Sequence, residues 1–135
     1  MIAVVCVDDR GGMLFHGRRQ SQDRAQREDL LAQCPGTLWM NSYSAKLFAG
    51  QEDRIAVDED FLNRAGPGEW CFVEDRPLSA AGDRMEGLVV YRWNRAYPGD
   101  LRLDINLDIF TRTSIQDFPG TSHEKITREC YRRSQ

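Results

Sequence analysis

The pattern of hydrophobic and polar positions predicts short strands and short helices that alternate along the chain. Residues 2–8 (IAVVCVD) form a continuous run of mainly β-branched apolar residues, which is typical of a central strand covered on both faces. A polar stretch follows, and apolar residues then return in a segment that Ser21 or Asp23 can cap. Because Cys34-Pro35-Gly36 ends that segment, we predict a helix that runs to about Gln33.

The same reasoning extends the alternation to the end of the chain. Apolar runs bounded by turn residues predict further strands at 37–40, 54–57, 69–73 and 87–93. Capped or apolar segments between them predict short helices at 41–50, 58–65 and 78–81. A short alternating segment at 101–104 is followed by two predicted antiparallel strands, at 109–116 and 126–131. This order predicts an α/β three-layer sandwich whose mainly parallel sheet has an antiparallel C-terminal edge.

The length and composition fit one globular domain that covers residues 1–135. A chain of this length can bury roughly 65–70% of its unfolded surface around a single core. Hydrophobic residues make up 41% of the sequence and charged residues 29%, which excludes a disordered or fibrous chain. No internal repeat or linker divides the sequence, so we expect no domain boundary.

No segment has the pattern of a membrane span or of a targeting signal. Every apolar run is far shorter than the roughly 18–20 residues that cross a bilayer. The N-terminal MIAVVCVDD also lacks the basic flank and the small-residue cleavage site of a signal peptide. We therefore expect a cytoplasmic protein with no membrane partner.

The cysteines and histidines predict no metal centre. Four cysteines occur without a Cys-x-x-Cys spacing, and we expect them to be reduced structural thiols. His16 and His123 are the two histidines, and neither has a second His or Cys at the spacing of metal ligands. We expect no bound metal.

Residues 16–29 (HGRRQSQDRAQRED) concentrate arginine and acidic residues around a Gln-Ser-Gln run. Arginines beside Gln and Glu on a helix are usually a solvated face, and an aspartate near a helix N-terminus is usually a cap. The alternative is that the stretch forms the entrance of an anion-binding site. The residues alone leave both interpretations open.

Five segments, in order, resemble dihydrofolate reductase over nearly the whole chain. They are MIAVVCVDDRGGM, SQDRAQRED, GTLWMNSYS, LVVYRWNRAYPGD and TSHEKITRECYRR. The resemblance implies that Asp23 stands where the family keeps the acid that binds the pterin ring. It also implies that Ser44 keeps a hydroxyl at the helix start beneath the nicotinamide cofactor. The Gly99-Asp100 and Ser122-His123 pairs match pairs at the end of a strand and before the last strand of the family.

Departures from the family pattern argue against its chemistry. A Gly-Gly pair that cradles the cofactor phosphates is replaced here by residues 73–77 (VEDRP), whose two carboxylates would repel a pyrophosphate. Arg24 and Arg27 replace two apolar positions that pack on the pterin, and Gly17-Arg18 replace a Pro-Trp pair. We therefore expect no cofactor, NADPH in particular, and no hydride transfer to folate.

The arginines favour an anionic small molecule or nucleotide-like ligand in the cleft that corresponds to the family's substrate cleft. A guanidinium group binds carboxylate and phosphate oxygens in a bidentate manner. We expect the cleft to be lined by Arg18, Asp23, Arg24, Arg27 and Tyr91, with Ser44 as a further ligand-binding residue.

Asp23 and His123 are the candidates for a catalytic role, although the sequence does not decide whether the protein is an enzyme. Histidine titrates near neutral pH and can act as a general acid or base. An exposed histidine that opens an edge strand is the commoner case. On such a strand Ser122 and His123 would point to opposite faces and would not form a nucleophile pair.

Two other classes of function stay open. One is an RNA or single-stranded nucleic-acid binding or processing protein, which would use a basic and aromatic surface. The residues of that surface would be Arg92, Trp93, Arg95, Tyr97, Lys125, Arg128, Arg132 and Arg133. The acidic net charge of −3 does not favour this alternative. The third class is a non-catalytic interaction protein whose cleft has collapsed.

Overall fold

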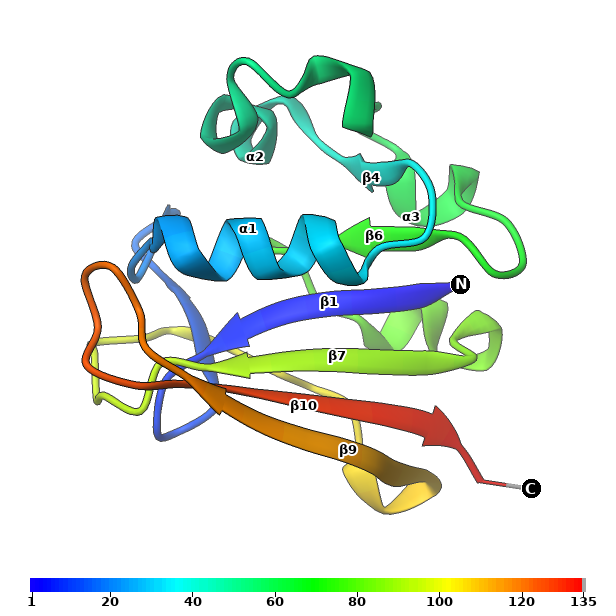
Figure 1. Cartoon of the computed structure of the whole chain (residues 1–135). Coiled ribbons are helices and arrows are strands. Elements are labelled where there is room, and N and C mark those ends of the chain that lie inside the picture. Colours follow the sequence, from blue (N-terminus) through cyan, green and yellow to red (C-terminus); the bar gives the residue numbers. More distant parts are fainter. Residues whose placement is uncertain (135) are drawn as a thin grey trace.

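The computed structural model describes residues 1–134, and a seven-stranded sheet forms its centre (Figure 1). In their order across the sheet, the strands are β5 (Ile55–Val57), β4 (Leu38–Met40), β6 (Trp70–Phe72), β1 (Ile2–Val7), β7 (Gly87–Arg92), β10 (Ile126–Arg133) and β9 (Phe110–Phe118). The pairs from β5 to β7 are parallel, whereas β10 is antiparallel to both β7 and β9. The predicted fold class is therefore confirmed, with β1 in the middle of the sheet as its apolar run predicts.

The helix α1 (Arg24–Gln33) covers one face of the sheet. Asp23 caps the helix, whose apolar residues gather at its C-terminal end, as the sequence predicts. There Leu30 and Leu31 pack with Val4 and Tyr91 from the sheet in one buried cluster. Fully burying a side chain such as Leu30 contributes about 1.5–3 kcal/mol to folding.

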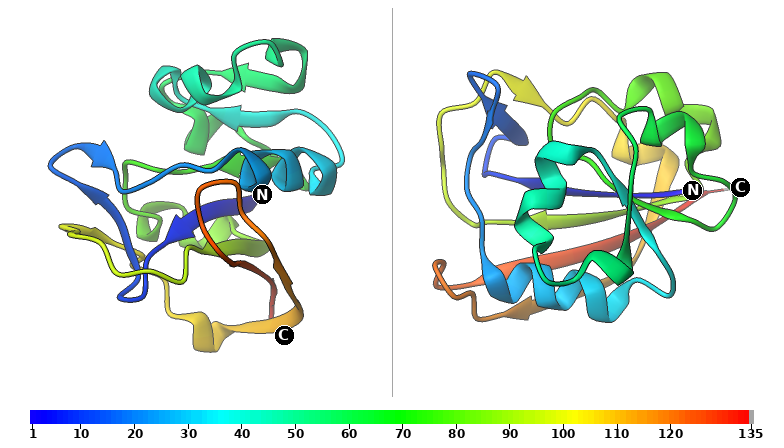
Figure 2. Two further views of the ribbon diagram at one scale, coloured as in Figure 1. Left: turned by 60° about the vertical axis from the view of Figure 1, so that its left-hand side comes forward. Right: turned by 90° about the horizontal axis from the view of Figure 1, so that it is seen from above.

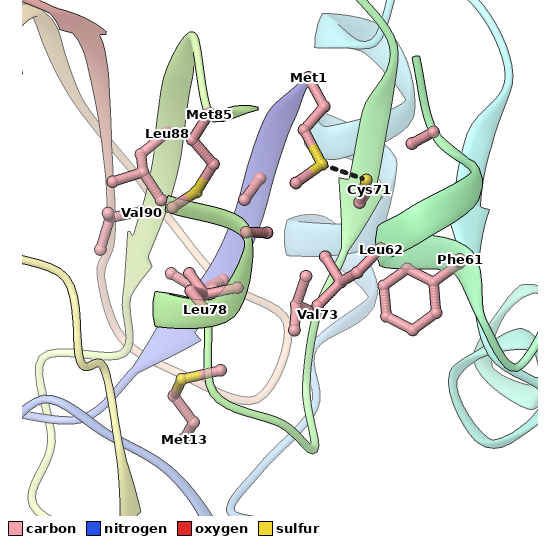
Figure 3. Close-up of a cluster of buried hydrophobic side chains, with 14 of the residues drawn as sticks. Met1, Met13, Phe61, Leu62, Cys71, Val73, Leu78, Met85, Leu88 and Val90 are labelled. Atoms are coloured by element: carbon pink, nitrogen blue, oxygen red, sulfur yellow. Dashed lines mark hydrogen bonds between the residues drawn. The ribbon is translucent and has the colours of Figure 1, made fainter. Parts of the chain in front are cut away.

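Short helices cover the other face, so the molecule has three layers (Figure 2). Phe61 and Leu62 of α3 (Phe61–Arg64) and Ala81 of the 3-10 helix η3 (Ser79–Arg84) contribute to the second buried cluster. Figure 3 shows Met85, Leu88 and Val90 in the same cluster. The remaining short helices are α2 (Ser42–Ala45), η1 (Lys46–Phe48), η2 (Glu52–Arg54) and η4 (Leu107–Ile109).

A second, three-stranded sheet was not predicted. It consists of β3 (Arg18–Arg19), β2 (Gly12–Phe15) and β8 (Leu101–Arg102), in that order. His16 and Gly17 connect β2 to β3 with φ values of 50° and 74°. Positive φ at both central residues is the geometry of a tight type I′ hairpin turn. This sheet carries the chain from β1 to α1 and positions residues 18–23.

The C-terminal hairpin is close to its predicted bounds. Its strands β9 and β10 extend two residues beyond the predicted C-terminal ends, and their register shifts between Cys130 and Tyr131.

All four cysteines carry free thiols. Within residues 1–134, no helix combines the length and the apolar character needed to cross a membrane.

Candidate functional site

The carboxylate of Asp23 is buried at the N-terminus of α1 and collects hydrogen bonds from two distant segments. Oδ1 accepts from the backbone N–H groups of Gln26 (3.2 Å) and Thr121 (3.0 Å), and Oδ2 accepts from that of Ser122 (2.8 Å). Burial by itself raises the pKa of a carboxyl group, but hydrogen bonds from Thr121, His123 and other donors outweigh it here. The pKa of Asp23 is consequently held well below its ordinary value, and the side chain is ionised at neutral pH.

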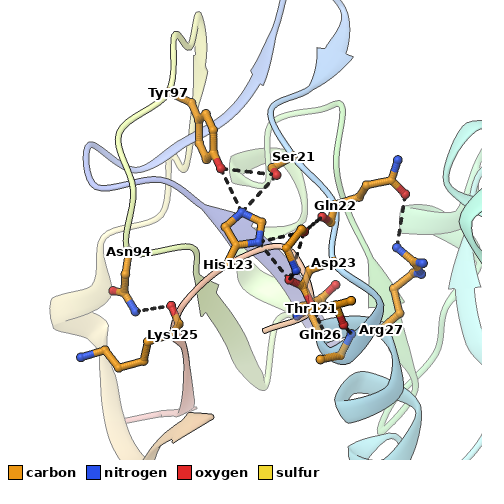
Figure 4. A network of polar contacts seen from close by, with 12 residues as sticks. Ser21, Gln22, Asp23, Gln26, Arg27, Asn94, Tyr97, Thr121, His123 and Lys125 are labelled. Carbon is orange, nitrogen blue, oxygen red and sulfur yellow. Dashed lines mark hydrogen bonds and ion pairs between the residues drawn. The ribbon is translucent and has the colours of Figure 1, made fainter. Parts of the chain in front are cut away.

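His123 connects this carboxylate to two hydroxyl groups (Figure 4). Its Nδ1 lies 3.0 Å from Asp23 Oδ2, and its Nε2 lies 3.1 Å from Ser21 Oγ and 2.9 Å from the Tyr97 hydroxyl. The imidazole ring is stacked on the indole of Trp93, with centroids 4.5 Å apart and an interplanar angle of 15°. Because an ionised carboxylate faces Nδ1, that nitrogen carries the proton, and Nε2 is left as an acceptor.

The structure corrects the expectation that His123 is an exposed residue at the start of an edge strand. His123 is only 5% exposed, and it lies in a bend that precedes β10 by several residues. Since the backbone at this point is not a strand, Ser122 does not point away from His123. Its hydroxyl lies 3.3 Å from Nδ1 and also hydrogen bonds to Asp23.

A surface depression of about 560 Å³ adjoins this network. It is lined by Phe15, His16, Arg18, Arg19, Gln20, Tyr97 and Pro98. Tyr97 belongs to both features, because its ring lines the depression and its hydroxyl contacts His123. The depression therefore borders the network through Tyr97 and offers cationic, aromatic and hydrogen-bonding side chains.

Comparisons with known proteins identify the fold. No protein-family model matches the sequence, and no curated protein matches it either. Among solved structures, the chain is similar to dihydrofolate reductase from Enterococcus faecalis complexed with NADP(H) and RAB-propyl, with a TM-score of 0.70. That match covers 99% of this chain and 96% of the other, at 9% sequence identity. The chain has the dihydrofolate reductase fold. The resemblance seen in the sequence is thus confirmed, and at this identity it concerns the fold alone.

Within the dihydrofolate reductase fold, Tyr91 does not line a cleft with Arg18, contrary to the prediction. Its ring is fully buried beneath α1, and its hydroxyl donates a hydrogen bond to Asp29 Oδ2 at 2.7 Å. Arg128 from β10 also binds both oxygens of Asp29. Burial, followed by the hydrogen bond to Asp29, raises the pKa of Tyr91 far above its ordinary value. Tyr91 is therefore a core residue whose hydroxyl is already paired.

Arg24 and Arg27 also lie outside the depression. The side chain of Arg24 is 70% exposed and lies 3.7 Å from Glu28, one turn along α1. The guanidinium of Arg27 donates to the side chain of Gln22 at 3.3 Å. The prediction that both arginines line one cleft with Tyr91 was wrong, because Arg24 faces solvent and Arg27 contacts Gln22, whereas Tyr91 is buried beneath the helix. Of the residues predicted to line the cleft, Arg18 lines the depression, and Asp23 is connected to it only through His123 and Tyr97.

Ser44 is buried and already hydrogen bonded within the chain. Its hydroxyl donates to Glu74 Oε1 at 2.7 Å, and Glu74 also accepts two hydrogen bonds from Arg19, at 2.9 and 3.0 Å. The guanidinium carbon of Arg19 lies 4.2 Å from the ring centroid of Tyr43. The neighbouring Asp75 accepts from the side chain of Asn41 at 2.8 Å. The residues that replace the cofactor glycines thus form a closed polar network that was not predicted.

The basic residues near the C-terminus are largely paired within the chain. Arg92 binds Glu129 at 2.8 Å, Arg128 binds Asp29, and Arg133 donates to the carbonyl oxygen of Met85 at 2.8 Å. Arg95 and Lys125 line a separate depression of about 690 Å³ with Trp93, Asn94 and Glu124. These cations therefore do not form one continuous stripe with unpaired guanidinium groups.

Sequence reasoning missed the roles of Ser21, Gln20 and Tyr97. The sequence indicates Ser21 as a possible helix cap, and Tyr97 as part of a turn and of a possible nucleic-acid surface. Ser21 and Tyr97 lie 102 and 26 positions from His123 along the chain, so no local spacing indicates their contacts with it. A partial signal is the Tyr-Pro-Gly-Asp sequence at 97–100, which is typical of a turn. In the structure Pro98 and Gly99 of this segment lie against Gln20.

Proposed function

We propose that the protein binds an anionic, nucleotide-like small molecule in the depression lined by Arg18 and Tyr97, without NADPH. The observation that carries this proposal is the position of Arg18. Its side chain lines the depression and forms no ion pair with any of residues 1–134. An uncompensated guanidinium beside a depression attracts an anion and can bind two of its oxygens at once.

The neighbouring Arg19 provides a contrast that makes Arg18 the anion-binding group. The charge of Arg19 is neutralised by Glu74, which it binds through two hydrogen bonds. The side chain of Arg18 points to the opposite face of β3 from that of Arg19, because alternate residues of a strand point to opposite faces. The depression therefore has one guanidinium whose charge is still available to a ligand.

Aromatic side chains favour a planar group on the ligand. The rings of Phe15 and His16 are stacked, with centroids 3.9 Å apart and an interplanar angle of 18°. Phe15 remains 37% exposed, and Tyr97 and Pro98 line the same depression. A base or other planar ring can stack on such a surface while its phosphate or carboxylate group contacts Arg18.

The network around Glu74 supports binding without NADPH. Glu74 and Asp75 occupy the place that the resemblance assigns to the phosphate-cradling glycines, and both are already hydrogen bonded within the chain. A pyrophosphate would have to displace Arg19 and Ser44 from Glu74 and would then meet an unpaired carboxylate. That repulsion disfavours a dinucleotide at this place.

Thermal melting with a set of candidate ligands tests the proposal. The set contains AMP, adenosine, folates, nicotinamide cofactors and a short RNA, since a ligand specific for the folded state raises Tm according to its occupancy. We expect AMP to stabilise the protein more than adenosine, because only AMP carries the phosphate. Arg18→Ala should weaken AMP binding by about tenfold, which corresponds to about 1.4 kcal/mol from a charge-assisted hydrogen bond.

Arg24→Ala is the matched control, because Arg24 is exposed and lies outside the depression. It should leave AMP binding unchanged. The proposal fails if no anionic small molecule raises Tm, or if Arg18→Ala and wild type bind AMP equally. Stabilisation by the RNA but not by AMP would instead favour the nucleic-acid alternative.

A further inference from the structure

Three side chains of the network have the connectivity of a nucleophile, a base and an orienting acid. Ser21 Oγ lies 3.1 Å from His123 Nε2, and His123 Nδ1 lies 3.0 Å from Asp23 Oδ2. This connectivity is the signature of an activated serine hydroxyl, whatever the order of the three residues along the chain. We propose that Ser21 is a nucleophile that attacks small carboxylic esters, with His123 as its general base.

Asp23 is a positioning residue in this arrangement. Its carboxylate is ionised and faces Nδ1, so it holds the imidazole in the tautomer that leaves Nε2 free to accept the Ser21 proton. The stacked indole of Trp93 and the burial of the ring restrict rotation of His123. The base is therefore fixed in the orientation that catalysis requires before a substrate arrives.

The hydroxyl group of Tyr97 becomes free to donate a hydrogen bond once Nε2 of His123 is protonated. In the resting state the hydroxyl groups of Ser21 and Tyr97 both lie near Nε2, which has a single lone pair to share. Once Nε2 has taken the Ser21 proton, it no longer accepts from Tyr97. The Tyr97 hydroxyl lies 3.5 Å from Ser21 Oγ and can then donate to the oxyanion that forms beside that atom.

The reaction balances without a further cofactor. Ser21 Oγ forms a bond to the acyl carbon, and its proton moves to His123 Nε2. The bond from the acyl carbon to the alcohol oxygen breaks, and the alcohol leaves with that proton. A water molecule then attacks the acyl-Ser21 ester, giving its proton to Nε2, and the carboxylic acid leaves as Ser21 regains a hydrogen.

The proposal requires that a substrate reaches Ser21 from the side of the depression. Ser21 is partly exposed and directly follows Gln20, which lines the depression with Tyr97. This inference goes beyond the binding of an anion, because an uncharged ester needs no contact with Arg18. The two proposals can therefore fail separately.

Diisopropyl fluorophosphate is the probe for the nucleophile. Its reaction forms a bond between Ser21 Oγ and phosphorus and releases fluoride, and mass spectrometry of the whole protein and its peptides locates the adduct. We expect one adduct, at Ser21, and hydrolysis of p-nitrophenyl acetate by the unmodified protein. Ser21→Ala should lose the adduct and lower the esterase rate by on the order of 100-fold or more, because the nucleophile itself is removed.

Ser122→Ala is the matched control, because the Ser122 hydroxyl lies beside the same imidazole but donates to the carbonyl oxygen of Gln22 and to Asp23 Oδ2, and it does not contact Nε2. It should keep the adduct at Ser21. The inference is wrong if the folded wild-type protein acquires no adduct, if the adduct forms elsewhere, or if Ser122→Ala loses it as Ser21→Ala does.

Asp23→Asn tests the positioning role through the pH profile of labelling. The titratable groups that contact the imidazole within residues 1–134 are Asp23 and Tyr97. Removing the carboxylate disfavours the protonated imidazole, so the midpoint of the rise in labelling rate should move to lower pH while the plateau falls. An unchanged midpoint would show that the base in the labelling reaction is not the imidazole beside Asp23, which would contradict the assignment.

Discussion

The imidazole of His123 lies 3.0 Å from the carboxylate of Asp23, although 100 positions separate the two residues. Asp23 is at the same time the cap of α1 and an acceptor for the backbone of Thr121 and Ser122. The start of α1 and the loop before β10 are therefore joined through one side chain. A change in that side chain should affect both segments together.

Asp23→Asn should lower the free energy of unfolding by about 1.5–3 kcal/mol at pH 7, because several hydrogen bonds lose their ionised acceptor. Asparagine still caps the helix about as well as aspartate, so the loss reflects the charge. The pKa of Asp23 is lowered in the folded state, so its contribution is present above the unfolded pKa of about 3.9. As pH falls below that value the contribution is lost.

Urea denaturation at pH 5 and 3.5 measures this dependence below the range in which histidine ordinarily changes its charge. The difference between wild type and Asp23→Asn should be smaller at pH 3.5 than at pH 5. Asp9→Asn, at an exposed aspartate, should change stability by less than about 0.5 kcal/mol throughout. If the difference grew as the pH fell, the pKa of Asp23 would be raised in the folded state and not lowered, contrary to this expectation.

Gly120→Ala should disturb the same site from the backbone side. A Cβ at this position would lie 2.6 Å from the carbonyl oxygen of His123 and 2.7 Å from Asp23 Oδ2, so the loop must shift. We expect a loss of about 1–3 kcal/mol, as for other overpacked positions. Gly36→Ala is the control, because a Cβ there meets no atom within 4 Å. Equal melting temperatures for the two variants would contradict the crowding at Gly120.

Arg19→Met should destabilise the fold by about 2–3 kcal/mol, because it leaves the carboxylate of Glu74 without its cation. Glu74 is 8% exposed and cannot regain full hydration. In the double variant Arg19→Met/Glu74→Gln the cost should be less than the sum of the two single costs, since neither charge remains. Chemical denaturation of all four proteins completes the cycle, and simple additivity would indicate that the pair is not coupled.

NADPH should produce no saturable quenching of the fluorescence of Trp39 or Trp70 at micromolar concentrations. The reason is the network of Glu74, Ser44 and Arg19 at the place that the resemblance assigns to the cofactor phosphates. A dissociation constant in the micromolar range, or any reduction of dihydrofolate by NADPH, would refute the expectation.

The main sheet could be predicted from the sequence because its strands have strong local patterns. The apolar run of β1, the cap at Asp23 and the terminal hairpin each depend on neighbouring residues. The small sheet was missed because β2, β3 and β8 are two to four residues long and lie among glycines and polar residues. Such short strands are held by their pairing and carry little periodicity of their own.

The site could be predicted only in part, because its contacts are between distant segments. Alternation along a strand puts Tyr91 and Arg92 on opposite faces, but the sequence does not indicate which face lies under α1. His123 was expected to be exposed because nothing near it in the sequence indicates that Trp93 and Asp23 bury it. Burial of a polar residue depends on partners that a linear pattern does not contain.

Both histidines of the chain lie face to face with an aromatic ring: His16 with Phe15, and His123 with Trp93. Ring currents from these neighbours shield the imidazole protons and move their NMR signals upfield. Only two histidine spin systems exist, so each can be assigned by a single substitution of its aromatic neighbour. The nitrogen shifts of the His123 ring would then report directly which nitrogen carries the proton, in the free protein and during reaction with an ester.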